Sequence, residues 1–122
     1  MGIGIMRTTV LDVNDLAVAE QFWCQVTGLA LEFSGWQGRF SRVGEEGPGS
    51  ILLQLVSEPK TAKNRAHLDF TVDDVARAVA EVARLGGTVV KPPGVFPEHE
   101  PRLEWAVVAD PFGNEFCLIR DV

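Results

Sequence analysis

Apolar and polar positions follow the same order in two stretches of the chain, residues 8–31 and 67–90. Each stretch starts with a strand-like apolar segment, passes through aspartate into apolar residues at helical spacing, and reaches glycine before another strand-like segment. At an offset of 59 positions, Asp15 falls on Asp74 and Gly28 falls on Gly87. The pattern predicts one supersecondary unit that is used twice.

The two predicted helices begin at polar caps and end at glycine. The first follows Asn14 or Asp15 and ends at Gly28. The second follows Asp73 or Asp74 and ends at residues 86–87. Residues at helical spacing form one apolar face on each helix: Leu16, Ala19, Phe22, Trp23 and Val26 on the first, and Val75, Ala78, Val79, Val82 and Leu85 on the second.

Strands are predicted on both sides of each helix, at 5–13, 29–34, 37–43 and 51–56 in the first half and at 67–72, 88–91, 103–110 and 115–119 in the second. We expect a hairpin turn at Ser34 and Gly35. A second turn is expected at residues 110–114, with Gly113 and Asn114 at positive φ. The prolines of residues 92–101 exclude regular structure there, and the long loop that continues to residue 102 is either functional or mobile.

These elements indicate an α+β fold class made of two βαβββ modules. Module one covers about residues 5–57 and module two about 65–122, and the polar segment at about 58–64 is the linker between them. With 122 residues, of which 46% are hydrophobic, the chain is large enough for a single domain with its own core.

Composition narrows the class of partner. The net charge is −6 and the basic residues are dispersed, so the chain lacks the basic stripe of a nucleic-acid-binding protein. An acidic surface favours solubility and, weakly, a cationic ligand. Cys24 and Cys117 lie in apolar segments, where a free thiol behaves as a small apolar group. No apolar run of the sequence is long enough to span a membrane. We expect a cytoplasmic protein with neither a nucleic-acid nor a membrane partner.

The first half contains LDVNDLAVAEQFW and TGL, and the second contains EPKTAKNRAHLDFTVDD, RLGG and ADPFGNEFCL. Together these segments resemble the vicinal oxygen chelate superfamily, which includes glyoxalase I, bleomycin-resistance proteins and extradiol dioxygenases. The chain is most similar to the short glyoxalase-like branch. The resemblance implies paired βαβββ modules whose mixed sheet curls into a cup, with the helices outside and a ligand inside. It also implies a homodimer.

In metal-dependent relatives, one residue from the first strand and one from the last strand of each module bind a divalent ion. The resemblance places Thr8, Gln54, His67 and Cys117 at these four positions. Only His67 is a good ligand for a hard or borderline ion, since a threonine hydroxyl and a neutral amide are weak ligands and a soft thiolate does not suit a magnesium or iron site. We therefore expect no metal cofactor, and neither an iron dioxygenase nor a glyoxalase I-type isomerase. A rearranged site that uses Asp69 is the remaining route to a metal ion.

A polar row alternates with an apolar row along residues 67–71. His67, Asp69 and Thr71 should face one way while Leu68 and Phe70 face the helix. The polar row would then line the cup. His67 and Asp69 are the candidate catalytic residues, because a histidine beside a carboxylate can act as a general acid or base. The alternative is that both make structural hydrogen bonds to the neighbouring loop.

Aromatic residues supply the other candidate binding surface. Trp36, Phe40 and Trp105 fall on predicted strands of the cup wall, where flat rings can hold an organic ligand or simply pack in a core or a dimer contact. The full candidate ligand-binding set is Thr8, Trp36, Phe40, Gln54, His67, Asp69, Trp105 and Cys117.

Two functions remain open from the sequence. The first is a cup that binds a small organic molecule without a metal, like the bleomycin-resistance proteins that sequester a drug. The second is a lyase or isomerase of unknown substrate, with His67 as general acid or base and with or without a divalent metal.

Overall fold

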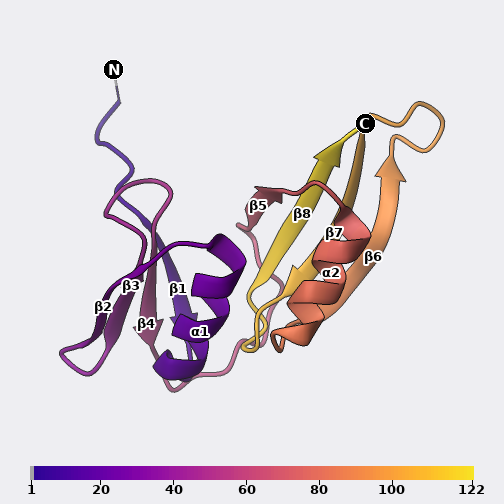
Figure 1. The fold of residues 1–122 in the computed structure, drawn as a ribbon. Helices are drawn as coiled ribbons and strands as arrows, with labels where there is room; N and C mark the ends of the chain where they lie inside the picture. The colour runs from indigo at the N-terminus through magenta and orange to yellow at the C-terminus, as the bar shows by residue number, and fades with distance from the viewer. Residues whose placement is uncertain (1) are drawn as a thin grey trace. The chain divides into compact units, whose positions relative to one another are not determined.

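The computed structural model describes residues 2–122, which form two compact units (Figure 1). The first unit ends at Pro59 and the second runs from Lys60 to Val122. Each unit contains one strand, one helix and three further strands in that order. The prediction of an α+β fold with two βαβββ modules is therefore confirmed.

The first unit contains β1 (Thr9–Val13), α1 (Leu16–Thr27), β2 (Leu31–Trp36), β3 (Phe40–Val43) and β4 (Ile51–Leu55). Its sheet has the order β1-β4-β3-β2. β1 pairs with β4 in parallel, whereas the other pairs are antiparallel. A parallel pair needs a long crossover, and α1 with the β2–β3 hairpin provides it.

Local sequence sets the ends of α1, and its apolar face forms the core. The Asp15 carboxylate accepts a hydrogen bond from the Val18 N–H at 3.0 Å, and Gly28 ends the helix with φ at 71°. Phe22 and Trp23 are fully buried and meet edge to face, with ring centroids 5.2 Å apart. Trp23 is thus a core residue of the first unit.

The second unit repeats this architecture with β5 (Leu68–Thr71), α2 (Val75–Arg84), β6 (Thr88–Phe96), β7 (Leu103–Ala109) and β8 (Glu115–Asp121). The sheet order is β5-β8-β7-β6, and β5 pairs with β8 in parallel. Asp74 caps α2 by accepting a hydrogen bond from the Arg77 N–H at 3.0 Å.

Helix α2 packs on one face of the second sheet, as Figure 1 shows. Alternate residues of β7 and β8 are buried on this side: Ala106, Val108, Phe116 and Leu118. Phe70 of β5 joins them, since its ring lies edge to face with Phe116 at 5.6 Å. The residues between these positions therefore point to the opposite face of the sheet, which is the open face.

Three local predictions were wrong. β2 continues through Gly35 to Trp36, and the hairpin turn contains Gln37 and Gly38, both at positive φ. The strand absorbs Gly35 as an irregularity in its pairing with β3. In the turn before β8, Gly113 has positive φ as expected but Asn114 does not.

The third error concerns the prolines after residue 91. β6 extends to Phe96 and passes through Pro92 and Pro93. It does so because β6 is an edge strand, where a missing N–H on the outer side breaks no ladder. The pairing with β7 shifts register between Lys91 and Gly94, so a bulge accommodates the prolines.

No helix among the described residues is long and apolar enough to cross a membrane.

Candidate functional site

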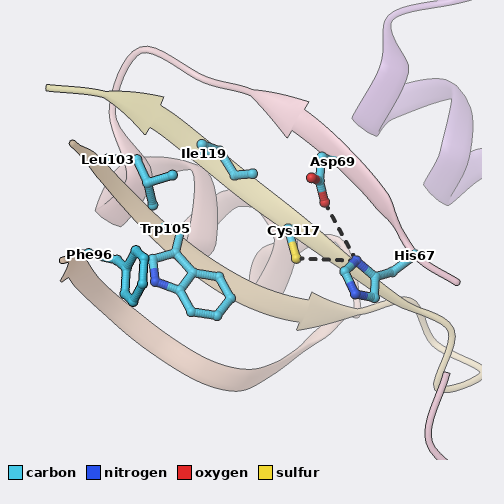
Figure 2. Close-up of a pocket in the computed structure, with 7 residues that line it drawn as sticks. All are labelled: His67, Asp69, Phe96, Leu103, Trp105, Cys117 and Ile119. Atoms are coloured by element: carbon cyan, nitrogen blue, oxygen red, sulfur yellow. Dashed lines mark hydrogen bonds and ion pairs between the residues drawn. The ribbon is translucent and has the colours of Figure 1, made fainter. Parts of the chain in front are cut away.

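The open face of the second sheet holds a pocket of about 250 Å³ (Figure 2). Side chains from β5, β6, β7 and β8 line it, together with the residue just before β5. They are His67, Asp69, Phe96, Leu103, Trp105, Cys117 and Ile119. Because the strand alternation turns these side chains away from α2, the pocket and the helix occupy opposite faces of one sheet.

The pocket has an apolar end and a polar end, as Figure 2 shows. Phe96, Leu103 and Trp105 form the apolar end, with Ile119 beside them. His67, Asp69 and Cys117 form the polar end. This arrangement suits a small molecule with an apolar body and one polar group.

At the polar end, two side chains approach the same nitrogen of His67. The Nδ1 atom lies 3.5 Å from Asp69 Oδ1 and 3.7 Å from Cys117 Sγ. Asp69 and Cys117 are direct partners in the parallel pairing of β5 with β8, and His67 precedes Asp69 by two positions on the same side. The side chains of His67 and Asp69 are 46% and 58% exposed, so a ligand in the pocket can reach both.

The environment of Cys117 keeps its thiol protonated. Burial raises the pKa of the Cys117 thiol, and the charge of Asp69 together with a hydrogen bond to that carboxylate raises it further. The residue as a whole is only 3% exposed. A thiol in this setting is not an activated nucleophile, since the thiolate is the reactive form.

The apolar end is organised around the Trp105 ring. The Lys91 ammonium lies 4.3 Å from the ring centroid and donates a hydrogen bond to the Pro92 carbonyl at 3.1 Å. Gly94 is the direct partner of Trp105 across the strands, and a Cβ at Gly94 would lie 3.2 Å from Lys91 Nζ. The bulge and the small residue thus leave room for the lysine over the indole.

The remaining candidate residues lie in the first unit. Trp36 and Phe40 are cross-strand partners with ring centroids 5.9 Å apart, and Phe40 is also the partner of Gln54. Trp36 is 60% exposed. Thr8 Oγ1 lies 2.7 Å from Ser50 Oγ and donates to the Ser50 carbonyl at 3.0 Å. Each unit therefore contains four of the eight predicted residues. The register places Thr8 beside Ser50, four positions before Gln54, so Thr8 does not join the group of Trp36, Phe40 and Gln54.

Sequence reasoning missed four residues around the pocket. Leu103 and Ile119 could have been found, because they lie two positions from Trp105 and Cys117 and must share their strand face. Phe96 and Lys91 could not be placed, because the prolines concealed the length of β6 and its bulge.

The four positions that relatives use for a divalent ion do not fit one here. The Thr8 hydroxyl is already bonded to Ser50, and Gln54 offers only a neutral carbonyl oxygen. His67 and Cys117, the other two, belong to the polar end of the pocket in the second unit. These four positions therefore offer no complete ligand set for the divalent ion of the metal-dependent proteins that the sequence resembles.

A family model described as a glyoxalase-like domain matches residues 8–119 of the chain. A structure of a hypothetical protein from S. aureus is 21% identical with a TM-score of 0.73, and the match covers 97% of each chain. A glyoxalase-related enzyme from Fulvimarina pelagi is 19% identical with a TM-score of 0.73, covering 95% of this chain and 87% of that one. A glyoxalase/bleomycin resistance protein from Albidiferax ferrireducens is 21% identical with a TM-score of 0.69, covering 94% and 98%. At this level of identity the three structures show a common fold. No curated protein matches the sequence at a significant level.

Proposed function

The chain belongs to the glyoxalase-like domain family, and on that premise we propose that it binds a small organic molecule in the pocket of its second unit. The binding would resemble that of bleomycin-resistance-like proteins, which act by sequestering a drug. It would not require a metal ion.

The observation that carries this proposal is the composition of the pocket wall. Four of the seven lining side chains are apolar, and one of them is an indole that presents a flat surface. The volume of about 250 Å³ lies just below the range of roughly 300–1,000 Å³ that is usual for ligand pockets, so it suits a small ligand. The polar end can then fix the orientation of that ligand through hydrogen bonds.

A ligand screen in the presence of a chelator tests the proposal. Ligand-observed NMR against a library of small aromatic and heterocyclic compounds would identify binders, and Trp105→Ala should weaken them on the order of tenfold by removing the ring they stack on. Val90→Ala is the matched control, because Val90 is an exposed apolar residue of the same sheet that does not line the pocket. The proposal would be contradicted if both variants lost the same affinity for the ligands, or if Trp105→Ala left that affinity unchanged.

A second function is supported by the contact between His67 Nδ1 and Asp69 Oδ1 at 3.5 Å. This contact orients the imidazole toward proton transfer, and the reaction class would be a lyase or isomerase. The test is to follow each ligand from the screen by NMR for conversion. If the chain is an enzyme, His67→Gln should reduce turnover far more than it reduces affinity, whereas a binder shows only a modest change in affinity.

A further inference from the structure

Three side chains with different donor chemistry converge at the polar end of the pocket. His67 offers an imidazole nitrogen, Asp69 a carboxylate oxygen and Cys117 a sulfur atom, and these donor atoms all lie within 4.8 Å of one another. Two of the three lie on strands, and the third is the last residue of the segment that leads into β5. β5 positions Asp69, the adjacent strand β8 positions Cys117 as its direct partner, and His67 immediately precedes β5.

The spacing of these atoms agrees with tetrahedral metal ligation. Bonds of about 2.0 Å to nitrogen and oxygen and about 2.3 Å to sulfur, at the tetrahedral angle, separate ligand atoms by roughly 3.3–3.6 Å. His67 Nδ1 lies 3.5 Å from Asp69 Oδ1 and 3.7 Å from Cys117 Sγ. Small side-chain rotations would therefore bring all three donors to bonding distance of one ion.

We propose that His67, Asp69 and Cys117 form a binding site for a borderline divalent cation of the Zn²⁺ type, with the fourth coordination position open to the pocket. The site differs from the four positions used by metal-dependent relatives, since Asp69 is not among them and all three ligands come from one unit.

The donor set selects the class of ion. Nitrogen and sulfur donors suit Zn²⁺ and related borderline ions, whereas Mg²⁺ and Ca²⁺ require oxygen ligands. The carboxylate and the thiolate together balance the charge of a divalent cation. When the ion binds, a metal–sulfur bond replaces the S–H bond of Cys117, and the thiol proton passes to solvent.

Titration with Co²⁺, a spectroscopic substitute for Zn²⁺, tests the site on the full chain purified without a histidine tag. A thiolate ligand produces a charge-transfer absorption in the near ultraviolet, and tetrahedral Co²⁺ absorbs strongly in the visible range. We expect both signals to appear near one equivalent and to disappear when Zn²⁺ is added.

Variants assign the ligands. Cys117→Ser should abolish the charge-transfer band, and Asp69→Asn should weaken Co²⁺ binding by at least about tenfold. Cys24→Ser and His99→Gln are the matched controls, because they remove the other cysteine and the other histidine and should leave the signals unchanged. Absence of the bands in the parent protein, or their loss in Cys24→Ser, would overturn the proposal.

Two further points keep the result unambiguous. Cys117 is buried, so circular dichroism must show that Cys117→Ser is folded. If it is not folded, the Co²⁺ affinity of Asp69→Asn tests the site, because Asp69 is exposed.

The metal site is tested independently of the proposed function, because the organic ligand is measured with a chelator and Co²⁺ is measured without that ligand. Either experiment can fail while the other succeeds.

Discussion

Asp69 acts on Cys117 through both charge and hydrogen bonding. The carboxylate faces the thiol across the β5–β8 pair, and its negative charge and its hydrogen bond add to burial in raising the pKa of Cys117. A raised pKa in the folded state favours folding while the thiol is protonated. This contribution is complete below the ordinary thiol pKa and disappears as the pH rises through the raised value.

Replacing Asp69 should therefore make Cys117 more reactive. Asp69→Asn removes the charge, so the pKa of Cys117 falls and more thiolate is present at a fixed pH near neutrality. We expect alkylation of Cys117 by iodoacetamide to accelerate several-fold, measured by peptide mass spectrometry in the presence of a chelator. Cys24 in the same molecule is the internal control, because burial and the charge of Glu20, rather than Asp69, raise its pKa. A parallel increase at Cys24 would indicate general loosening of the fold instead.

At the scale of elements, one carboxylate joins α1 to the β2–β3 hairpin. Glu20 Oε2 accepts hydrogen bonds from the hydroxyls of Ser34 and Ser41, and Ser41 Oγ in turn accepts the Gly35 N–H at 3.0 Å. Ser41 is fully buried, so its hydroxyl depends on a protein partner. The same hairpin carries the aromatic pair of the first unit, whose position therefore depends on the helix.

Glu20→Ala should destabilise the protein by about 1–3 kcal/mol, because it leaves the buried Ser41 hydroxyl without its charged acceptor. Urea denaturation gives this value from the midpoint at constant slope. Glu32→Ala is the control, since Glu32 is an exposed carboxylate on β2 and should change stability little. Similar values for the two variants would mean that the Glu20 network does not stabilise the hairpin.

Some of the helices, strands and turns could be predicted from the sequence and others could not. Helical spacing and acidic caps located α1 and α2, and period-two alternation correctly separated Asp69 from Leu68 and Phe70. The hairpin turn and the length of β6 were missed, since both depend on pairing with a neighbouring strand rather than on local preference. The convergence of His67, Asp69 and Cys117 also depends on strand register, because β5 and β8 are distant in sequence.

At the scale of the whole molecule, the two units share a topology but present different side chains at their surfaces. The first presents a tryptophan and a phenylalanine on a hairpin, whereas the second holds the pocket with the histidine, the carboxylate and the thiol. The repeat could be recognised in the sequence because both units use the same helix caps and core positions. The pocket could be predicted only in part, because side chains on the open face can differ between the units.

The net charge of −6 is a property of the whole molecule, and it should increase the affinity for a cationic ligand. If the screen yields a cationic ligand, its affinity should fall on the order of twofold or more as NaCl rises from low to high concentration, since salt screens the attraction. Calorimetric titration of the cation and of a neutral compound of the same shape gives the comparison. An equal salt response for both would show that the acidic surface does not attract the ligand.

The position of Trp105 gives the protein an internal optical reporter. One face of the indole lies under the Lys91 ammonium, and the ring also lines the pocket, so a bound ligand must alter its fluorescence. The other two indoles provide contrast, because Trp23 is sealed in a core and Trp36 is largely exposed. Iodide would quench Trp36 and spare Trp23, and the emission that then responds to ligand would come from Trp105. Occupancy of the pocket could thus be followed without a label.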